Sequence, residues 1–422
     1  MKILVVGGGA REHTLVWKLA QSPKAEEIYV APGNAGTAQI ACNLPIGSSD
    51  VDGLVEVVKD KRIDLVIVGP EAPLANGIVD RFTAMGIPIF GSTRQATQIE
   101  SSKVFAKELM QKYNIPCAGS ASFSEYPLAK DYIQGQKSPT VIKADGLAAG
   151  KGVAVANTLP EALAFLSNLM ETKALGRAGD RVIVEEYLSG RELSYFAFTD
   201  GKTVVPMSAA CDYKRAFDND RGPNTGGMGC YSPPHFYSST LSEKVQVTIM
   251  EPTIKAMAQE EIPYKSVLYA GLMITMNGPK VLEFNARFGD PETQVIIPLL
   301  ETDLVDIVLA VIEGKLDQIN ITWSDDACVG VVMASAGYPG NYKTGFPITG
   351  LDELDKGILV FHAGTQAGSE PGQALTDGGR VLTVVAIDET VAKARDKVYA
   401  NIHKIKFKGC HYRRDIAQIK VK

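Results

Sequence analysis

Short apolar runs alternate with longer helix-like stretches over the first part of the chain, up to about residue 90. The apolar runs cover Lys2–Val6, Glu27–Ala31, Asp64–Val68 and Pro88–Phe90. Strands that alternate with helices in this way predict a doubly wound parallel sheet. Ligands bind to such sheets beyond the carboxyl ends of the strands, where the connecting loops gather. We therefore expect an N-terminal α/β domain whose loops form part of a binding site.

Loops rich in glycine or proline follow three of these strands, at Gly7–His13, Pro32–Thr37 and Gly69–Pro73. The first loop is an incomplete dinucleotide fingerprint, because Glu12 stands where the third glycine belongs and the second strand ends without an acidic residue for a ribose. We therefore reject NAD as a ligand. We expect instead a phosphate at the loop amides and helix start, with Arg11 beside it. Ordinary turn chemistry is the alternative for all three loops.

A lysine-bearing strand predicted at Thr140–Lys143 leads into a glycine-rich loop that also carries Lys151. Glycines allow close backbone approach to phosphates, and the two lysines add positive charge. The spacing is not that of a Walker A loop, which would place Ser or Thr at the position of Gly152. A flexible hairpin turn is the alternative. The glycines of this loop are Gly146, Gly150 and Gly152.

Polar residues also mark one helix start and one strand crossing. Ser101–Ser102 reads as an N-cap, and Lys103 follows it at a helix end that disfavours a cation unless an anion lies nearby. The strand predicted at Arg181–Leu188 ends in acidic residues, and Glu192 opens the next strand. Backbone groups at this crossing are able to pair with an adenine edge, and Glu192 with ribose hydroxyls. An ordinary surface acid is the alternative for Glu192.

The densest group of polar residues follows a strand predicted at Val281–Phe284. Side chains alternate along a strand, so Glu283 and Asn285 share a face, and Arg287 joins them if the strand continues. Magnesium ions prefer oxygen ligands and are often shared with substrate phosphates, while a guanidinium suits a carboxylate or phosphoryl group. The alternative is a solvated strand followed by an ordinary turn at Gly289–Pro291.

Two later regions complete the chain. Residues 212–229 are polar and glycine-rich, as is typical of lids and substrate loops, with disorder as the alternative. Ala327–Ser335 and Gly379–Ile387 predict strands of a third, α+β unit that starts at about residue 327.

Composition narrows the class of protein. The chain has 422 residues, 45% of them hydrophobic and 22% charged, as in ordinary soluble proteins of more than one domain. A net charge of −5 gives no reason to expect nucleic-acid binding. The apolar run at the N-terminus is too short for a signal peptide, and no run would span a bilayer, so we expect no membrane association and a cytoplasmic location. The six cysteines lack zinc or redox spacing and predict reduced, mostly packed thiols.

Taken together, the run Lys143–Val153, the acidic strand end Glu185–Leu188 and the stretch Glu283–Gln294 resemble the ATP-grasp carboxylate–amine ligases. More closely, nearly the whole chain is similar to the family of phosphoribosylamine–glycine ligases, also called glycinamide ribonucleotide synthetases. Further motifs of that family occur in its order and at its spacing. They are Gly7–His13, Pro32–Thr37, Gly69–Pro73, Asn224–Gly229 and His362–Thr365.

The resemblance implies three domains and an ATP-dependent reaction. The domains are an N-terminal substrate domain at 1–100, an α+β ATP-grasp domain at 101–326 with a lid subdomain at about 120–190, and a C-terminal α+β domain at 327–422. Glycine would be activated by ATP as glycyl phosphate, and 5-phosphoribosylamine would attack it to give glycinamide ribonucleotide, ADP and phosphate in purine biosynthesis. A monomer is expected, with a weak dimer as the alternative.

The resemblance also implies residue roles. Glu283 and Asn285 would hold Mg²⁺ or Mn²⁺, while Arg287, Lys143 and Asp212 would act on the reacting groups. The residues expected at the nucleotide are Lys103, Lys143, Gly146, Gly150, Lys151, Gly152, Glu185, Glu186, Leu188 and Glu192. Those expected at glycine or phosphoribosylamine are Gly9, Arg11, Glu12, His13, Asn34, Gly36, Thr37, Glu71, Asp212, Asn224, Thr225, Gly226, Gly227, Arg287 and Asp290.

Four positions depart from the family's common pattern, namely Gly8, Ala10, Ser92 and Tyr213, the last of which stands where histidine is frequent. Two rival functions follow from the same residues. Another ATP-grasp enzyme, such as a purine formate ligase or a biotin carboxylase, is disfavoured by Asn224–Gly229 and the short C-terminal unit. A nucleotide-binding protein that has lost catalysis is disfavoured by the intact residues Lys143, Glu283, Asn285 and Arg287.

Overall fold

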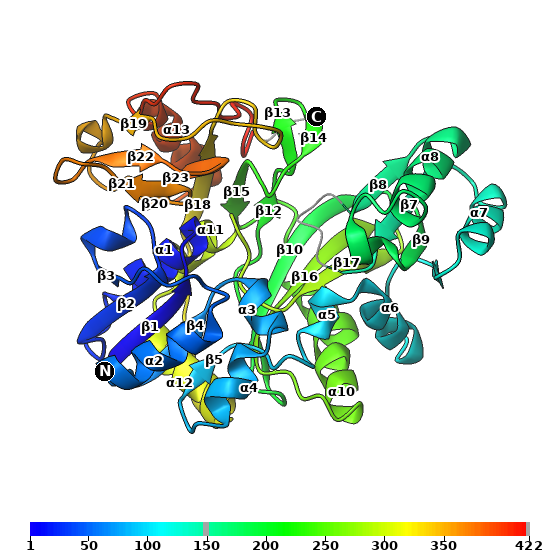
Figure 1. Cartoon of the computed structure of the whole chain (residues 1–422), viewed down its shortest axis with the longest axis horizontal. Coiled ribbons are helices and arrows are strands. Elements are labelled where there is room, and N and C mark those ends of the chain that lie inside the picture. The colour runs from blue at the N-terminus through cyan, green and yellow to red at the C-terminus, as the bar shows by residue number, and fades with distance from the viewer. Residues whose placement is uncertain (147–151, 419–422) are drawn as a thin grey trace.

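A five-stranded parallel sheet forms the N-terminal part of the computed structural model, which describes residues 1–146 and 152–418 (Figure 1). The strand order is β3-β2-β1-β4-β5. The strands are β1 (Lys2–Gly7), β2 (Glu27–Pro32), β3 (Cys42–Asn43), β4 (Leu65–Val68) and β5 (Ile89–Phe90). The helices of this part are α1 (Ala10–Leu19), α2 (Val51–Lys61), α3 (Glu71–Ala75) and α4 (Ile78–Thr83).

Strand β1 shows why this sheet is buried on both sides. Ile3 and Val5 belong to a core cluster that also contains residues of α1 and of α12 (Leu304–Glu313). Leu4 and Val6 alternate with them and belong to a second cluster with residues of α2 and α4. Helices therefore cover both faces, as a parallel sheet requires. The predicted doubly wound parallel sheet is confirmed.

A four-stranded antiparallel sheet forms the centre of the molecule, in the order β11-β10-β16-β17. On one face, the alternate residues Leu193, Tyr195 and Leu268 pack against the helices around it. The opposite face, which carries Glu192, Tyr269 and Glu283, lines a cleft. The strands are β10 (Arg191–Thr199), β11 (Val204–Pro206), β16 (Ser266–Thr275) and β17 (Gly278–Asn285), and the helices are α5 (Gln98–Ser101), α6 (Lys103–Lys112), α9 (Ser239–Val245), a π-helical turn at Gln246–Met250 and α10 (Glu251–Gln259).

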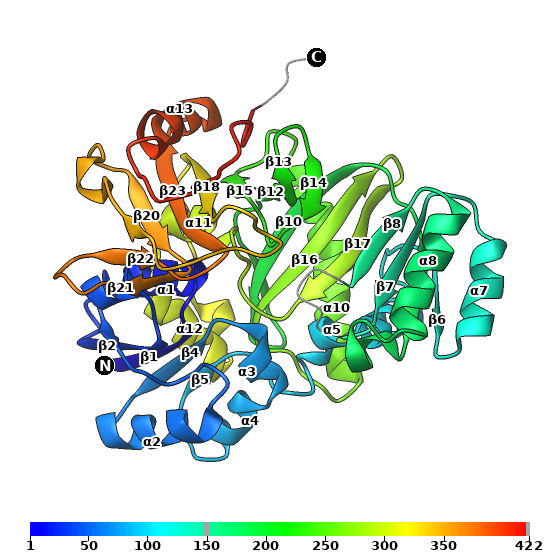
Figure 2. The ribbon, with the colours of Figure 1, turned by 45° about the horizontal axis from the view of Figure 1, so that its top comes forward.

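A second antiparallel sheet, which we call the lid, lies to the right of the central sheet in Figures 1 and 2 and carries two helices on its outer side. Its strand order is β6-β9-β7-β8. Its strands are β6 (Ser120–Phe123), β7 (Thr140–Ala144), β8 (Val153–Ala156) and β9 (Val182–Glu186), and its helices are α7 (Tyr126–Gln134) and α8 (Leu159–Met170). The predicted strands at 140–143 and 181–188 are confirmed, with the second one shorter at both ends.

A five-stranded sheet with the order β12-β15-β18-β23-β20 joins the C-terminal part to the middle of the chain. Its strands are β12 (Cys211–Asp212), β15 (Gly229–Ser232), β18 (Ala327–Ala334), β20 (Leu359–His362) and β23 (Arg380–Asp388), with α13 (Val391–Ile402) packed on it. The predicted strands at 327–335 and 379–387 are confirmed. A small sheet of β19 (Pro347–Ile348), β22 (Ala374–Thr376) and β21 (Thr365–Ala367) lies beside it.

The prediction that residues 212–229 form a long loop or a disordered segment is wrong. The segment contains a two-stranded ribbon of β13 (Arg215–Phe217) and β14 (Arg221–Asn224), followed by the start of β15. Asn219 and Asp220 turn the ribbon with positive φ angles of 59° and 52°, a conformation that these two residue types tolerate. The polar composition therefore reflects a tight turn.

Two further expectations concern the cysteines and membrane-spanning segments. All six cysteines are free thiols, but Cys42 is exposed and so is not a packing residue, whereas Cys230 and Cys328 are buried. No helix of residues 1–146 and 152–418 has the length and apolar character needed to cross a membrane.

Candidate active site

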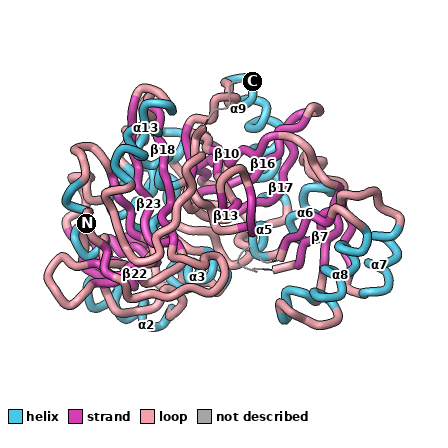
Figure 3. Tube along the Cα trace, turned by 90° about the horizontal axis from the view of Figure 1, so that it is seen from above, coloured by secondary structure: helices cyan, strands magenta, loops and turns pink. Residues whose placement is uncertain are grey.

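The cleft over the central sheet has a volume of about 1250 Å³ and is bordered by the lid, α6 and the β13–β14 ribbon. Figure 3 shows the lid strands and helices standing apart at one end of the molecule, opposite the N-terminal body. Pockets for one drug-sized ligand usually occupy roughly 300–1,000 Å³. The cleft therefore has room for a nucleotide and a second substrate together.

Two lysines and one glutamate form a buried cluster at the lid end of the cleft. Lys143 on β7 lies with its Nζ 2.9 Å from Glu185 Oε2, and Lys107 on α6 with its Nζ 3.0 Å from Glu185 Oε1. None of the three side chains is more than 8% exposed. Two cations on one carboxylate leave a net positive charge at the cleft wall, which suits an anionic ligand.

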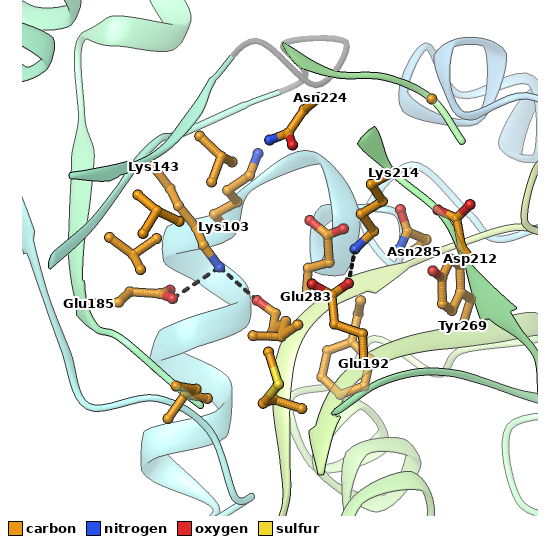
Figure 4. Close-up of a pocket in the computed structure, with 18 of the residues that line it drawn as sticks. Lys103, Lys143, Glu185, Glu192, Asp212, Lys214, Asn224, Tyr269, Glu283 and Asn285 are labelled. Carbon is orange, nitrogen blue, oxygen red and sulfur yellow. Dashed lines mark hydrogen bonds and ion pairs between the residues drawn. The ribbon is translucent and has the colours of Figure 1, made fainter. Parts of the chain in front are cut away.

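Lys143 also ties the lid to the central sheet. Its Nζ donates to the Leu282 carbonyl oxygen at 2.9 Å (Figure 4). Leu282 is the extra residue of a β-bulge, because Val281 pairs with Leu272 and Glu283 pairs with Gly271. Since β17 is an edge strand and the bulge interrupts its pairing, the carbonyl at this point is free to accept the lysine.

Glu283 and Asn285 lie where the sequence predicted, on the cleft-facing side of β17. In Figure 4, Glu283 points into the cleft between Lys103 on one side and Lys214 on the other. Burial opposes ionisation of Glu283, but the ammonium groups of Lys214, Lys143 and Lys103 hold its pKa below the usual value. The side chain is therefore an anionic oxygen donor at neutral pH.

The donor set fits a divalent cation that is shared with a ligand. Glu283 offers a carboxylate and Asn285 an amide oxygen, both hard oxygen donors of the kind that Mg²⁺ prefers. In the described part of the chain, no group of three or more His, Cys, Asp or Glu side chains forms a metal cage. A cation at Glu283 and Asn285 would therefore take its remaining ligands from phosphate oxygens and water.

Arg287 also lines the cleft, but not as a continuation of strand β17, as the sequence had suggested. The strand β17 ends at Asn285, so Arg287 does not continue its alternation. Its guanidinium is held by Glu100 at 2.9 Å and Glu71 at 3.2 Å, and it donates to Asn285 Oδ1 at 3.3 Å. Burial opposes the positive charge, but Glu100 and Glu71 together raise the pKa of Arg287. The result is a permanently charged group fixed beside the candidate metal ligand.

Asp212 and Lys214 face the opposite side of the cleft. Lys214 donates from Nζ to Glu192 Oε2 at 2.7 Å, and surrounding carboxylates outweigh its burial and raise its pKa. Burial, reinforced by the charge of Glu292, raises the pKa of Asp212 well above its usual range. Asp212 Oδ1 has no hydrogen-bond partner among the residues that the structure describes. It is a buried acceptor available to a cationic ligand.

Gly227 makes the position of Asp212 possible. Its φ angle is +109°, and a Cβ atom there would lie 2.4 Å from Pro291 Cδ and 2.7 Å from Asp212 Oδ1. Only glycine combines this backbone conformation with such close contact. The neighbouring residues Asn224, Thr225 and Gly226 line the cleft, as predicted for a substrate segment.

Asp290 is held by the C-terminal sheet. Arg380 on β23 lies 3.1 Å from Asp290 Oδ2 and donates to the carbonyl oxygens of Gly226 at 2.6 Å and Asp290 at 2.9 Å. Tyr338 accepts the Gly226 N–H at 3.0 Å. Burial opposes ionisation of Asp290, but the nearby arginines Arg380 and Arg11 hold its pKa below the usual value.

The predicted residues of the first loop do not line this cleft. The side chain of Glu12 fills the loop instead, accepting the Gly9 N–H at 2.7 Å and pairing with Arg11 Nε at 2.6 Å. Gly7 gives it room, because a Cβ there would lie 2.5 Å from Glu12 Cγ. The amide and the guanidinium that we expected to hold a phosphate are thus occupied internally. Arg11 also donates to the Phe288 carbonyl at 3.2 Å, so the loop contacts the stretch that carries Asp290.

The remaining predicted residues of the N-terminal domain form a second internal network. His13 Nδ1 accepts the His362 N–H at 2.8 Å, and Asn34 Nδ2 donates to the His362 carbonyl at 2.8 Å. Asn34 Oδ1 accepts the N–H groups of Gly36 and Thr37 at 2.8 and 3.0 Å. These side chains join the N-terminal loops to β20 and do not line the cleft.

The predicted nucleotide residues line the cleft, apart from Gly146 and two that the structure does not describe. Lys103 donates to the Gly146 carbonyl at 2.9 Å, and Glu186 accepts the Gly119 N–H and pairs with Lys280. Gly150 and Lys151 lie outside the described residues. The predicted residues that line the cleft here are Lys103, Lys143, Gly152, Glu185, Glu186, Leu188 and Glu192.

Three family models together match almost the whole chain. The Phosphoribosylglycinamide synthetase N domain matches residues 1–100, its ATP-grasp (A) domain matches 101–293 and its C domain matches 328–419. The chain belongs to the phosphoribosylglycinamide synthetase family. Membership makes it an ATP-grasp ligase, and the expected fold class is confirmed.

Relatives and solved structures agree with the family assignment. A phosphoribosylamine–glycine ligase of Halalkalibacterium halodurans is 49% identical over 99% of this chain and 96% of its own length. One of Caldanaerobacter subterraneus subsp. tengcongensis is 50% identical over 99% of both chains. A solved structure of phosphoribosylamine–glycine ligase from Thermotoga maritima has a TM-score of 0.85 at 32% identity and covers 99% of this chain and 100% of that one.

Several residues of this family member were missed at the sequence level. Lys107 lies four positions after Lys103 on α6, so helical spacing alone places both on one face. Lys214 is adjacent to the predicted Asp212 segment, but its contact with Glu192 is set by the fold. Glu100 and Arg380 carried no local signal, because their partners are distant in sequence. Glu292 belongs to the predicted stretch Glu283–Gln294, but its hydrogen bond from Tyr269 could not be predicted from that stretch.

The departure of Tyr213 from the family's common histidine has a structural account. The Arg413 guanidinium lies 4.9 Å from the centre of the Tyr213 ring, and the Tyr213 hydroxyl accepts the Ala417 N–H at 3.0 Å. Tyr213 therefore packs against the C-terminal segment at the edge of the cleft, and none of its contacts with described residues indicates proton transfer. At a second departure, the Ser92 hydroxyl pairs with Thr97 Oγ1 at 2.8 Å.

Proposed function

We propose that this chain joins glycine to 5-phosphoribosylamine, with ATP cleaved to ADP and phosphate. The glycine carboxylate attacks the γ-phosphorus, the bond to the ADP oxygen breaks, and glycyl phosphate forms. The amine of phosphoribosylamine then attacks the carbonyl carbon, the carbon–oxygen bond to phosphate breaks and the amine releases a proton. The observation that carries the proposal is the placement of Glu283, Asn285 and Lys143 around one cleft.

The nucleotide occupies the lid end of the cleft. The Lys107–Glu185–Lys143 cluster supplies a fixed positive charge, and Lys103 adds another at the start of α6. Leu188 and Glu192 line the same cleft and are the candidates for contact with the base and the ribose. Phosphoryl transfer depends on positioning and charge neutralisation, which these groups provide without any protein nucleophile.

Glu283 and Asn285 hold the divalent cation, Mg²⁺ or Mn²⁺. When bound, the cation neutralises developing charge on the phosphates and aligns them. In Figure 4 the Lys214 side chain lies beside Glu283, where its ammonium group would contact the same phosphate oxygens. Glu283 stays ionised because of the lysines that surround it, so the ligand is ready before the nucleotide arrives.

Glycine lies between Arg287 and Asp212. The fixed guanidinium of Arg287 suits its carboxylate and the acyl phosphate. Asp212 is the better of two candidates for its ammonium group, because Asp290 already pairs with Arg380 and accepts from Gln294, whereas Asp212 Oδ1 is unpartnered in the described part of the chain. An arriving ammonium favours the ionised form of Asp212 and offsets the effect of burial.

Phosphoribosylamine lies where the N-terminal domain meets the Asp290 stretch. Arg11 contacts Phe288, and a Cβ atom at Gly9 would lie 3.7 Å from Asp290 Oδ2, so this loop borders the Asp290 end of the cleft. Glu71 lines the cleft and lies on the same side. The loop residues Glu12, His13, Asn34, Gly36 and Thr37 then shape this site through their internal hydrogen bonds.

We also propose the domain division 1–100, 101–326 and 327–422, and a monomer as the working unit. The separate parallel, central and C-terminal sheets support the division. Strands β15 and β18 pair across the second boundary, so the last two domains share a sheet.

An ADP-release assay tests the function, with phosphoribosylamine generated in situ and one substrate left out at a time. We expect ADP release that requires glycine, a divalent cation and phosphoribosylamine, with one glycinamide ribonucleotide formed per ADP. Turnover with formate or bicarbonate but not with glycine would contradict the proposal. Tight ATP binding without turnover in the complete mixture would favour a protein that has lost catalysis.

A further inference from the structure

We propose that the C-terminal segment His411–Ala417 positions Lys214 for phosphoryl transfer, with Arg413 as the central positioning residue. The inference rests on the proposed function, since it assigns Lys214 to the phosphates. The segment itself does not line the cleft, whereas Tyr213, Arg215 and Asp220, which it contacts, do. We call the segment the C-terminal clamp.

Arg413 is the most completely buried large side chain of the clamp, with no exposed surface. Its Nη1 donates to the Arg215 carbonyl at 3.0 Å and to Asp220 Oδ1 at 2.9 Å. Its Nε and Nη2 donate to the two carboxylate oxygens of Asp415 at 2.8 and 2.7 Å. A planar guanidinium with this many partners fixes geometry as well as charge.

Arg413 holds the chain on both sides of Lys214. On one side its guanidinium lies over the ring of Tyr213, and on the other it binds the carbonyl of Arg215. The Tyr213 hydroxyl is held as well, because it accepts the N–H of Ala417. The backbone that carries Lys214 is therefore fixed from outside the cleft.

Further hydrogen bonds join the clamp to the turn of the β13–β14 ribbon. Asn219 N–H donates to Asp415 Oδ2 at 2.8 Å, and Arg414 N–H donates to Asp218 Oδ1 at 2.8 Å. His411 Nε2 lies 2.8 Å from the Ala216 carbonyl. Every residue from Tyr213 to Asp220 except Lys214 and Phe217 thus has a hydrogen bond or ion pair to the clamp. The Phe217 ring packs edge-on against His411.

The ribbon requires such support. Strands β13 and β14 form a sheet of two strands, and no other strand of the described residues pairs with them. Isolated two-stranded ribbons are marginally stable at best. The clamp itself is anchored on α13, where Tyr399 donates to the Arg413 carbonyl and Arg395 donates to the carbonyls of Arg414 and Ile416. The rigid helix therefore transmits its position through the clamp to Lys214.

The test compares Arg413→Met with Arg414→Met, which removes the same charge from an exposed neighbouring side chain. We expect Arg413→Met to lower kcat about 10- to 100-fold, with a smaller effect on the KM for glycine. A displacement of the Lys214 ammonium group by about 1 Å is enough to slow the reaction by that factor. Arg414→Met should stay within about twofold of the parent chain. An unchanged kcat for folded Arg413→Met would overturn the proposal.

A double-mutant cycle separates positioning from general structural support. If Arg413 acts through Lys214, adding Arg413→Met to Lys214→Met should lower kcat little further. Independent effects that multiply would overturn the proposal. A clamp that only stabilises the fold would lower the melting temperature but would leave both kcat and the ratio of ADP to glycinamide ribonucleotide unchanged at 25 °C.

Two milder variants keep the proposal testable if Arg413→Met does not fold. Asp220→Asn weakens one contact of the ribbon, and Tyr213→Phe removes the acceptor of Ala417 N–H while keeping the ring. Each of these two variants should fold like the parent chain and have a lower kcat. In a Lys214→Met background, neither substitution should lower kcat further. An unchanged kcat in both single variants would overturn the proposal. Failure of the parent chain to turn over glycine would count against the proposed function, whereas an active parent with insensitive variants would count against the clamp alone.

Discussion

The guanidinium of Arg380 lies 3.1 Å from the carboxylate of Asp290, which precedes it by 90 residues. The same guanidinium binds the Gly226 carbonyl, so one side chain of the C-terminal sheet fixes two loops of the cleft. We predict that Arg380→Met lowers kcat/KM for glycine about 10- to 100-fold, because Asp290 loses its cation and Gly226 its donor. Steady-state kinetics with glycine varied will measure it.

Two milder variants should lower kcat/KM for glycine by smaller factors. Arg380→Lys keeps the charge but not the fork of donors and should recover part of the loss. Tyr338→Phe removes one acceptor from Gly226 N–H and should cost less than either arginine variant. The exposed Arg177, replaced by Met, is the control for loss of an arginine charge. Equal activity of all four variants would contradict a role for the C-terminal sheet in the cleft.

Glu283→Gln should lower kcat at least about 100-fold and shift the cation requirement to higher concentration, because the anionic ligand is lost. The melting temperature should change much less, since Glu283 lines the cleft and not the core. Glu243→Gln, at an exposed position on α9, is the control. Metal titrations of activity, run beside thermal melts, decide the case. Equal loss of stability and activity would argue against a ligand role.

Lys143→Met should raise the KM for ATP more than it changes the KM for glycine. The variant removes the ammonium group that joins Glu185 to the Leu282 carbonyl and leaves Glu185 with Lys107 alone. We expect a loss of about 10- to 100-fold in kcat/KM for ATP, as is typical of charged contacts to phosphates. Lys137→Met, on an exposed part of the lid, is the control. A larger effect on glycine than on ATP would place Lys143 elsewhere.

The His13–His362 contact predicts sensitivity to acid. Burial, with the neighbouring His362, lowers the pKa of His13 to about 3, and burial lowers the pKa of His362 to about 4. Both rings are thus neutral in the folded chain, and their contribution to stability is complete above about pH 6.5. As the pH falls below that value the unfolded chain takes up protons first, and stability is lost by about 1.4 kcal/mol per pH unit for each ring.

Urea unfolding from about pH 7.5 to about pH 4.5 will measure this dependence. His362→Asn should remove roughly one proton from the slope in this range, whereas His403→Asn, at an exposed position, should not. Parallel slopes for the parent chain and His362→Asn would contradict a neutral buried ring.

Local patterns were sufficient for several strands and for the shared face of the two candidate metal ligands. Short runs of apolar, mostly β-branched residues such as Ile3–Val6 and Val329–Val332 predict buried strands, and both runs lie in strands. The shared face of Glu283 and Asn285 follows from strand alternation alone, and the structure keeps it. Resemblance added the reaction, which no local pattern could supply.

Contacts between distant segments could not be predicted in the same way. Strand β17 ends at Asn285, so Arg287 does not continue it and pairs with Glu100 and Glu71. The side chain of Glu12 fills its own loop, a choice that depends on the space left by Gly7 and Gly69. The 212–229 segment looked like a loop because its strands are short and its support comes from residues 411–417.

The sheet β12-β15-β18-β23-β20 carries Asp212 on its first strand and Arg380 on its fourth. Asp212, the proposed ligand of the glycine ammonium group, and Arg380, which pairs with Asp290, therefore belong to the same hydrogen-bonded sheet. A chain cut near residue 326 would lose β18, one of the two strands that pair with β15. A chimera that takes its C-terminal domain from another such ligase must therefore restore the pairing of β15 with β18, because the strand that carries Asp212 pairs with β15.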